Sequence, residues 1–495
     1  MTAQDAIPFD NSYARLPDQF FSRLDPTPVS KPGPIRVNRP LAESLGIDPD
    51  WLASEEGIAV IAGNRVPAGA EPIATVYAGH QFGSYNPQLG DGRAILLGEV
   101  IGTDGKRYDI QLKGSGPTPY SRGGDGRAPL GPVIREYVVS EAMYALGVPT
   151  TRALAAVTTG DTVARQQFEP GGVLARVAAS HIRIGTFQFF AAQRDTEALH
   201  LLVDHVLERH YPAQLTAENR PLALLQSVIS AQAALVARWQ LLGFIHGVMN
   251  TDNMLLSGET VDYGPCAFMD AFNPETVFSS IDHAGRYAYR NQPGMAHWNL
   301  TCLAQTLLPL IDSDTDRAVA QAQEAIDSFP GQFMDAHTAG LAAKLGLEQV
   351  TEDDTSLIED LFTLMAENKA DFTLTFRYLA DTANPDSGRA TIADIYSLPD
   401  ALLPWRERWL QRLADDDESG ASECRAGMYR ANPIYIPRNH LVEAAIRAAV
   451  DEGDLAPFNA LVDRLAQPFD YEPGDSRYAL PPIDGEEVRE TFCGT

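Results

Sequence analysis

The chain has 495 residues, more than an ordinary single domain, and its 44% hydrophobic and 21% charged residues are typical of a folded globular protein. It carries 38 basic and 66 acidic residues, which gives a formal net charge of −28. A charge of this sign repels phosphate backbones, so we expect no binding to nucleic acid or to anionic membranes, although local cations can still hold a nucleotide.

The sequence carries no sign of secretion, of a zinc site or of a membrane span. Its four cysteines are widely spread and none has CxxC spacing, which argues against zinc and against a secreted disulfide scaffold. The N-terminal sequence lacks the apolar core of a signal peptide. The most apolar long stretch, residues 222–245, is interrupted by polar side chains and is predicted to be a buried amphipathic helix. We therefore expect a soluble cytoplasmic protein.

The first half of the chain is predicted to form strands. Residues 1–70 are rich in proline and irregular, which predicts an N-terminal extension lying on a domain. Residues 71–190 are predicted to be a β-rich lobe. In this lobe the apolar runs AILLGEVI and YDIQLKG flank the turn TDGKR, a pattern that predicts an antiparallel hairpin. A helix is predicted at 132–146, and further strands at 153–158 and 172–177.

Helical periodicity dominates after residue 195. Helices are predicted at 197–210, 222–242, 298–311, 317–328 and 356–367, with more beyond 399. Because the predicted strands come before the predicted helices, we expect an α+β protein, with a β-rich N-terminal lobe and a helical C-terminal lobe over 191–465. Residues 466–495 are again rich in proline, glycine and acidic residues and are predicted to be a C-terminal tail.

A glycine-containing loop, LGDGRA at residues 89–94, comes directly before the predicted hairpin. Gly90 and Gly92 flank one residue and would let backbone N–H groups approach a phosphate closely. A tight turn is the plainer interpretation of the same pattern. The chain contains no GxxxxGK[ST] sequence, so a Walker A loop is excluded.

Lys113 ends the second strand of the hairpin, where a kinase-like lobe places its phosphate-binding lysine. A lysine at this position can also simply extend into solvent. The helix predicted next carries two possible partners, Glu136 and Glu141, and we favour Glu136.

Two further features of the first half favour an anionic ligand. The loop at 115–131 is dense in glycine, proline, arginine and aspartate, which is typical of a loop that wraps a ligand. Arg176 and Arg183 lie among apolar residues of a very acidic chain. They indicate a bound anion such as a triphosphate, with structural ion pairs as an equal alternative.

The most informative stretch follows the long 222–242 helix. His246, the pair Asp252–Asn253 and the DYG tripeptide at 262–264 resemble the kinase catalytic loop leading to its DFG motif. Magnesium prefers hard oxygen ligands, which Asn253 and Asp262 would supply. They are 262 − 253 = 9 residues apart, enough for a tight apolar hairpin to return them to one point. Asp252 would accept a hydroxyl proton as general base.

Four blocks of sequence together resemble the selenoprotein O family: residues 77–94, 111–137 and 246–254, and the terminal TFCGT. The resemblance implies a bilobal protein-kinase-like fold in which ATP lies reversed, so that AMP is transferred to Ser, Thr or Tyr hydroxyls of proteins. It implies magnesium as the metal, for which manganese can substitute.

The resemblance also implies roles for individual residues. Asp252 would be the catalytic base, Asn253 and Asp262 the metal ligands, and Glu136 the residue that orients Lys113. Nucleotide contacts would come from Gly90, Gly92, Arg93, Lys113, Asp125, Gly126, Arg176, Arg183 and Asp262.

Two positions bear on how far the kinase comparison extends. Val248 occupies the place of the aspartate in the kinase HRD motif, which disfavours a standard kinase and transfers the base role to Asp252. Cys493 stands where eukaryotic members of the family carry selenocysteine. We hypothesise that it pairs with Cys266, the alternative being two unlinked thiols.

Two other functions remain open at this point. One is a phosphotransferase that moves the γ-phosphate of ATP. The other is an inactive ATP-binding scaffold, which the missing HRD aspartate would permit. The oligomeric state and the protein substrates do not follow from the sequence.

Overall fold

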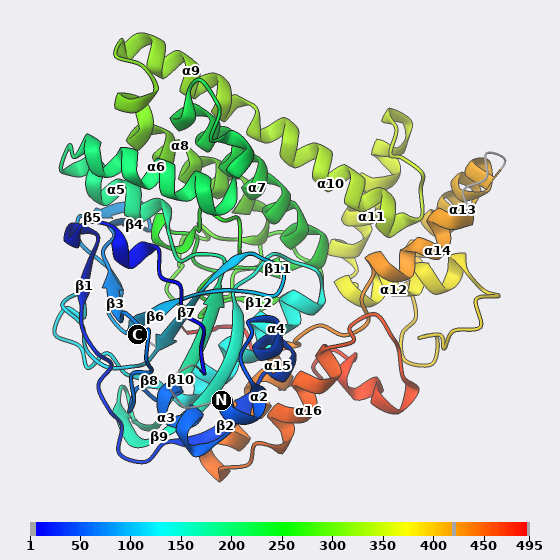
Figure 1. Ribbon diagram of the computed structural model, residues 1–495. Helices are drawn as coiled ribbons and strands as arrows, with labels where there is room; N and C mark the ends of the chain where they lie inside the picture. Colours follow the sequence, from blue (N-terminus) through cyan, green and yellow to red (C-terminus); the bar gives the residue numbers. More distant parts are fainter. Residues whose placement is uncertain (1–5, 418–421, 493–495) are drawn as a thin grey trace.

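The computed structural model describes residues 6–417 and 422–492, and its centre is one antiparallel sheet packed beside a large group of helices (Figure 1). The strand order is β1-β3-β6-β7-β10-β9-β2, with the short β8 paired to β10. The strands are β1 (Phe21–Arg23), β2 (Gly33–Val37), β3 (Ile73–Thr75), β6 (Ala94–Ile101), β7 (Arg107–Lys113), β8 (Ala128–Pro129), β9 (Arg152–Ala164) and β10 (Phe168–Ala178). The mixed class with strands first and helices after is therefore confirmed.

The β6–β7 pair is the predicted hairpin. Its register pairs Ala94 with Lys113 at one end and Ile101 with Arg107 at the other. In β6 residues 94–100 are buried, and in β7 residues 109–112 are buried, with Ile110 and Leu112 in the hydrophobic core. This hairpin fixes where Lys113 emerges from the sheet.

The N-terminal segment contributes both edge strands of the sheet, β1 and β2. The sequence predicted only an irregular extension here, because the prolines obscure the strand pattern. Pro34 lies in β2, an edge strand that pairs with β9 alone, and an edge strand tolerates the missing proline N–H. Helices α1 (Arg39–Ser44), α2 (Pro49–Leu52) and α3 (Glu55–Ile61) then cover apolar residues of the sheet.

Helix α4 (Leu130–Ala145) lies where a helix was predicted and packs against β9 and β10. Its other neighbours come from the far end of the chain, α15 (Asn439–Arg447) and α16 (Ala456–Leu465). The ring of Tyr137 on α4 meets that of Phe458 on α16 at 5.4 Å between centroids. The helices after residue 439 therefore return to the sheet rather than extending the helical group.

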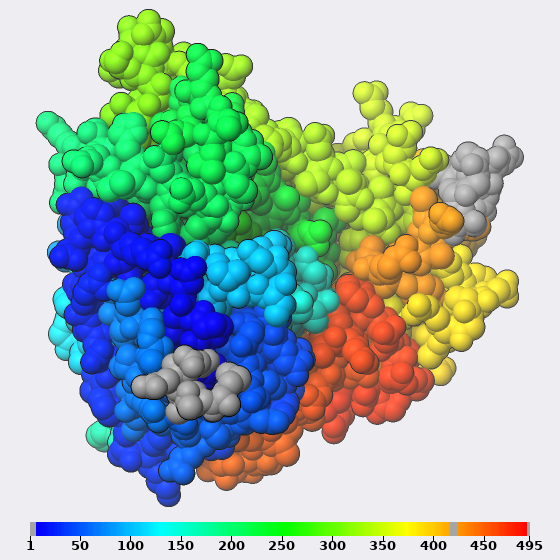
Figure 2. Space-filling model, viewed as in Figure 1, coloured from blue at the N-terminus to red at the C-terminus, as the bar shows by residue number. Residues whose placement is uncertain are grey.

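The molecular surface also shows that the C-terminal part of the chain lies against the N-terminal part. In Figure 2 the C-terminal residues, coloured orange to red, lie directly against the blue N-terminal surface. Arg36 of β2 donates hydrogen bonds to Asn459 and Asp463 of α16, at 2.9 and 2.5 Å. The two ends of the chain thus enclose the sheet together.

The remaining helices form the group above the sheet and its extension to one side (Figure 1). They are α5 (Ile184–Ala192), α6 (Thr196–His210), α7 (Arg220–Leu242), α8 (Gln292–Ile311), α9 (Thr315–Asp327), α10 (Phe329–Leu345), α11 (Thr355–Glu367), α12 (Phe372–Ala383), α13 (Leu403–Asp417) and α14 (Ser422–Ala431). The five helices predicted by range between residues 197 and 367 are confirmed as α6, α7, α8, α9 and α11.

Helix α7 is the centre of this group. Among the described helices it alone is long and apolar enough to cross a membrane by length and composition. It packs against α6, α8, α9 and α10, so other parts of the chain cover its apolar side chains. It ends at Gly243, which has a left-handed φ of 70° and lies so close to Phe372 that a side chain there would clash.

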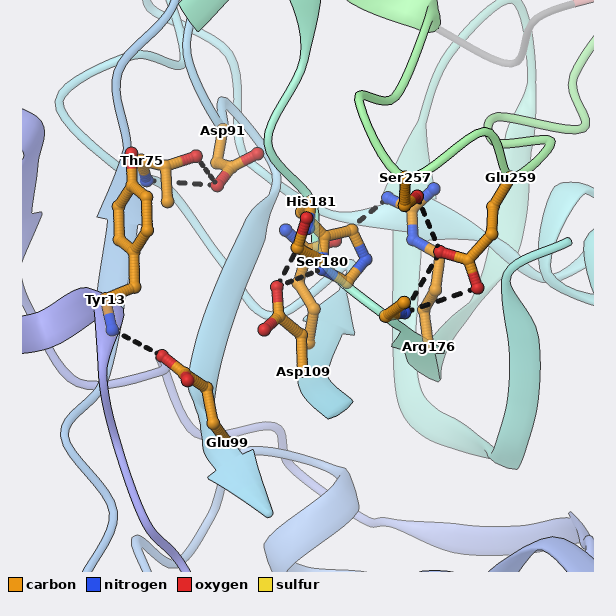
Figure 3. Close-up of polar contacts among 12 residues, drawn as sticks. Tyr13, Thr75, Asp91, Glu99, Asp109, Arg176, Ser180, His181, Ser257 and Glu259 are labelled. Atoms are coloured by element: carbon orange, nitrogen blue, oxygen red, sulfur yellow. Dashed lines mark hydrogen bonds and ion pairs between the residues drawn. The ribbon is translucent and has the colours of Figure 1, made fainter. Parts of the chain in front are cut away.

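Buried charges join the sheet to the helices, and Figure 3 shows the two strand carboxylates involved, Asp109 and Glu99. Asp109 of β7 accepts hydrogen bonds from the backbone N and Nδ1 of His181, at 2.9 and 3.0 Å, and from Arg209 of α6 at 2.8 Å. Arg209 also lies 3.3 Å from Glu99 of β6, which accepts the backbone N–H of Tyr13. Burial alone would raise the pKa of Asp109, but the charge of Arg209 and the contacts with His181 hold it well below its usual range.

Candidate active site

A cleft of about 550 Å³ opens between the sheet and the segment that follows α7. Every residue predicted to contact nucleotide or metal lines it, except Glu136, which lies behind Lys113: Gly90, Gly92, Arg93, Lys113, Asp125, Gly126, Arg176, Arg183, Asp252, Asn253 and Asp262. The volume is within the range of small-molecule sites in proteins. The fold thus brings positions from 90 to 262 in the sequence to one cavity.

Lys113 forms an ion pair with Glu136. Its Nζ lies 2.5 Å from Oε2 of Glu136, whereas Glu141 forms hydrogen bonds with Arg152 at 2.7 and 2.8 Å. Five residues advance an α-helix by about 140°, so the two glutamates of α4 face different neighbours. Glu136 rather than Glu141 pairs with Lys113 because Glu136 is on the side of α4 that faces the end of β7.

Asp262 lies among three cations. Nη1 of Arg176 is 2.7 Å from its Oδ1, Nη1 of Arg183 is 2.7 Å from its Oδ2, and Nζ of Lys113 is 3.7 Å away. Burial alone would raise the pKa of Asp262, but the charges of Arg183, Arg176 and Lys113 hold it well below its usual range. The carboxylate is therefore ionised, and a cluster of positive charge gathers in a strongly acidic chain.

The backbone of Asp262 has a left-handed φ of 63°. Aspartate tolerates this region better than most residues, but the conformation still carries strain and requires support from its surroundings. Tyr263 supplies some of that support, because its hydroxyl bonds with the Thr150 hydroxyl. Thr260, two residues before Asp262, forms a parallel β-bridge with Thr150.

The tight hairpin predicted between Asn253 and Asp262 does not form. Leu255 bridges instead to Arg183, and Thr260 bridges to Thr150, so the intervening backbone pairs with the segments on either side of it. These outer partners satisfy the backbone groups that a hairpin would have paired. Asn253 and Asp262 nevertheless both face the cleft.

Asp252 lies in a single 3-10 turn, Thr251–Asn253, and its residue surface is 7% exposed. Its Oδ2 accepts a hydrogen bond from Nε2 of Gln81 at 3.2 Å, while the buried Oδ1 has no hydrogen-bond partner. Burial raises the pKa of Asp252 to about 6, against the opposing effects of Arg183 and Gln81. A carboxylate in this state is a stronger base than one in water.

A two-stranded hairpin, β4 (Gly79–Gln81) and β5 (Ser84–Asn86), covers the Asp252 turn. The backbone N–H of His80 donates to Oγ1 of Thr251 at 2.7 Å, and that of Phe82 donates to Oδ1 of Asn250 at 3.0 Å. Its two turn residues, Phe82 and Gly83, have φ values of 50° and 84°, as a two-residue hairpin requires. Gly79 packs so tightly on Asp252 that no side chain fits between them.

The glycines of the 89–93 loop are required by packing. Gly90 has a φ of 88°, and a Cβ there would lie 2.5 Å from the ring of Tyr120. A Cβ at Gly92 would lie 2.8 Å from the Tyr120 carbonyl oxygen. Between them, Asp91 is buried and accepts hydrogen bonds from the backbone N–H and the hydroxyl of Thr75 (Figure 3). The loop is therefore held rigidly at the edge of the cleft.

His246 of the predicted catalytic loop and His80 of the β4–β5 hairpin both have structural contacts. His246 is buried, and its Nε2 lies 2.9 Å from the carbonyl oxygen of Val261. His80 contacts Gln188 through Nδ1 at 2.8 Å. Val248 lines the cleft with an apolar side chain at the position where kinases carry their aspartate. Asp252 is the one acidic residue in the sequence of this loop, residues 246–254.

The oxygen donors suit magnesium only together with phosphate groups. Among residues 6–417 and 422–492, no three His, Cys, Asp or Glu side chains gather as a metal site would require. Asn253 and Asp262 supply two hard oxygen donors to one cleft, and magnesium accepts so few protein ligands when phosphates and water complete its shell. Because Arg176 and Arg183 now bind Asp262, a metal would need anionic groups that draw them away.

Sequence motifs did not identify three residues that the structure places beside Asp252. Gln81, Asn250 and Gln188 form hydrogen bonds with the 250–252 loop or with the hairpin that covers it. The run GHQFG, an amide between two glycines, was the available signal for Gln81. Nothing local marks the other two.

The hypothesised Cys266–Cys493 disulfide stays a prediction. Cys266 is buried, and Cys493 lies outside the described residues. Two residues earlier, Oγ1 of Thr491 donates a hydrogen bond of 2.7 Å to the carbonyl oxygen of Pro265. The end of the described chain thus lies next to the residue that precedes Cys266.

Comparison with known proteins gives one family. The sequence model described as "Protein adenylyltransferase SelO" matches residues 5–466. "Protein nucleotidyltransferase YdiU" of Rhodopseudomonas palustris (strain BisB5) is 59% identical over 489 residues, 99% of each chain. Proteins of the same name from Bradyrhizobium diazoefficiens and from a strain of Methylorubrum extorquens are each 59% identical, over 492 and 496 residues and 99% of both chains.

Proposed function

The chain belongs to the SelO family of protein adenylyltransferases and is a nucleotidyltransferase, and from this we propose that it transfers AMP from ATP to Ser, Thr or Tyr hydroxyls of proteins. The proposal includes a magnesium requirement and a kinase-like arrangement of two lobes around the cleft. The order of the parts supports that arrangement: glycine loop, strand lysine, helix glutamate, Asp252 turn and DYG motif follow one another as they do in kinases.

The observation that carries the proposal is the cation cluster around Asp262. Lys113, Arg176 and Arg183 converge within 4 Å of one carboxylate, in a chain whose net charge is −28. Keeping three buried cations at one point costs free energy unless anions balance them, and the two carboxylates among them, Asp262 and Glu136, still leave one positive charge in excess. A triphosphate balances that excess, and the guanidinium groups can bind its oxygens in pairs.

The proposed reaction assigns a step to each part of the cleft. Asp252 accepts the proton of the acceptor hydroxyl, whose oxygen then bonds to the α-phosphorus of ATP. The bond from the α-phosphorus to the bridging oxygen breaks, and pyrophosphate leaves with the electron pair. Arg176, Arg183 and Lys113 neutralise the charge on the leaving group. A magnesium ion held by Asn253 and Asp262 would supply further charge neutralisation on the phosphate oxygens.

The orientation of ATP, with its α-phosphate toward Asp252, is part of the proposal and rests on the family. ATP labelled at either the α- or the γ-phosphate tests it directly. We expect protein-bound label from the α position only. Label from the γ position only would indicate a phosphotransferase, and ATP binding without either label would indicate an inactive scaffold.

Variants connect the chemistry to the cleft. Asp262→Ala should abolish transfer, since it removes a carboxylate ligand and the partner of three cations. Asp252→Asn should lower kcat by about 10² to 10⁴ while the Kd for ATP stays close to that of the wild type. Asp353→Ala alters an exposed aspartate outside the cleft and serves as the control. Transfer at wild-type rate by either cleft variant would contradict the assignment.

A further inference from the structure

Arg286 has an unusual environment for an arginine in so acidic a chain. Its Nε is buried without a hydrogen-bond acceptor, and within the described parts of the chain no carboxylate lies within ion-pair distance of its guanidinium. Arg290, four residues later, instead pairs with Glu275. The nearest acid in sequence, Asp282, accepts the backbone N–H groups of Arg286 and Tyr287 at 2.9 and 2.7 Å and so faces the backbone.

Aromatic rings hold the Arg286 side chain in place. Its Cζ lies 4.9 Å from the ring centre of Trp298 on α8 and 5.8 Å from that of Tyr287. Contacts of this kind orient a guanidinium without neutralising it, so the charge stays available for an anion. The residue is only partly buried, so it can be reached from solvent.

Arg286 lies beside the hairpin that covers the Asp252 turn. A Cβ at Gly83, on the hairpin turn, would be 3.8 Å from Cζ of Arg286. The neighbouring Tyr287 packs against Phe82 at 5.2 Å between ring centres, and its hydroxyl donates to Oδ1 of Asn250 at 2.7 Å. Two residues after Asn250 comes Asp252. Arg286 therefore lies next to the turn of the hairpin that covers the proposed base.

The position of Arg286 is outside the nucleotide cleft, since it is absent from the lining that includes Arg93, Arg176 and Arg183. Phe82 and Ile281 do line the cleft; Phe82 packs on Tyr287, the neighbour of Arg286, and Ile281 is 57% exposed. A polypeptide that brings a hydroxyl to Asp252 would pass over this rim. Its residues next to the hydroxyl would then lie close to Arg286.

We propose that Arg286 binds an acidic side chain of the protein substrate, close in sequence to the hydroxyl that receives AMP. The inference rests on the proposed adenylyltransferase function and adds a substrate class to it. Because the net charge of −28 repels acidic segments elsewhere, one oriented and unneutralised arginine at the rim gives a local attraction that selects them. The guanidinium can bind a carboxylate through two parallel N–H groups.

Peptide libraries with a fixed Ser, Thr or Tyr and randomised flanking residues test this proposal. The full-length protein is incubated with the library, ATP and magnesium, and peptides that gain AMP are sequenced by mass spectrometry. We expect enrichment of Asp and Glu at one or two flanking positions. For a matched pair of peptides, acidic and amide-substituted, we expect kcat/KM to favour the acidic one by about tenfold, mainly through KM.

Variants separate recognition from stability. Arg286→Gln should remove the preference for the acidic peptide and leave kcat/KM for the amide peptide unchanged, and Arg286→Glu should shift enrichment to Lys and Arg. Arg290→Gln, which alters an exposed arginine paired with Glu275, should keep the wild-type preference. The Kd for ATP and the Tm are measured for each variant to identify any general damage.

The outcomes distinguish this proposal from the function on which it rests. AMP transfer by the wild type without any preference for flanking acids would overturn the role of Arg286 and leave the function intact. Equal losses on both peptides in Arg286→Gln, with an unchanged Tm, would also overturn it. No AMP transfer to any peptide or protein by the wild type would overturn the function and the inference together.

Discussion

The side-chain amide of Gln81 donates a hydrogen bond of 3.2 Å to Oδ2 of Asp252, and thereby links the β4–β5 hairpin to the proposed base. The other carboxylate oxygen has no partner, so this bond is what orients the group. Three hydrogen bonds join the hairpin to residues 250–252: two come from backbone N–H groups and one from the Gln81 side chain. The hairpin thus fixes the position of the Asp252 carboxylate.

Gln81→Leu should lower kcat for AMP transfer by about tenfold or more, because a hydrogen bond to a charged group is worth roughly 1.5 to 3 kcal/mol. The Kd for ATP should change little, since Gln81 contacts Asp252 rather than the cation cluster. Steady-state kinetics and nucleotide titration measure the two quantities. Gln88→Leu, an exposed glutamine of the same segment, is the control, and an equal loss of kcat in both variants would contradict a positioning role.

The two glutamates of α4 give a matched comparison. Glu136→Gln removes the partner of Lys113 and the charge 3.2 Å from Arg176, so we expect transfer to fall by about 10 to 100-fold. Glu141→Gln disturbs the contacts with Arg152, Asn38 and the backbone N–H of Ala153, so we expect a loss of stability of about 1 to 3 kcal/mol with activity largely kept. Activity assays beside urea unfolding curves separate the two effects; a larger activity loss in Glu141→Gln would refute the assignment.

Arg209 and Asp109 should be strongly coupled in stability. Both side chains are 4% exposed, and Arg209→Met leaves Asp109 with its His181 contacts but without the guanidinium charge, so it should lower the free energy of unfolding by about 3 to 5 kcal/mol. The double variant Arg209→Met with Asp109→Asn should lose less than the sum of the single losses. A double-mutant cycle by denaturant unfolding measures this difference, and simple additivity would show that the pair does not join sheet and helices.

The burial of Lys344 predicts that the free energy of unfolding depends on pH. The residue is 3% exposed, its Nζ lies 4.1 Å from the ring centre of Phe376, and burial lowers its pKa from 10.5 to about 7. Between pH 7 and 10.5 the unfolded chain therefore binds a proton that the folded chain does not, so this lysine makes the free energy of unfolding rise with pH across that window. Below pH 7 the full cost of burying the charge remains.

Lys344→Met removes that titration. We expect the variant to be more stable than the wild type at about pH 6, by on the order of 1 kcal/mol or more, and the gain to shrink toward about pH 10. Thermal or urea unfolding at several pH values measures it. Lys369→Met, at a lysine whose residue is exposed, is the control with no such trend. A gain that does not depend on pH would assign the effect to packing alone.

Local sequence patterns predicted the parts of this protein whose structure is decided by near neighbours. The β6–β7 hairpin follows from two apolar runs around a short turn, and helices α4, α6 and α7 follow from their own periodicity. Lys113 could be predicted because its place at the end of β7 is a matter of counting along one hairpin. The prolines hid β1 and β2, because edge strands owe their pairing to β3 and β9 rather than to their own pattern.

Where the sequence offered more than one candidate, the tertiary structure decided which of them meets its partner. Glu136 rather than Glu141 meets Lys113 because of the rotation of α4 against β7. Gln81 and Asp252 are 171 positions apart, and Asp109 and Arg209 are 100 positions apart, so neither contact leaves a periodic trace in the sequence. The residue types and their order thus determined the chemistry that the chain can perform. Which of them meet was determined by long-range packing, since it is the buried sheet and α7 that bring these distant segments together.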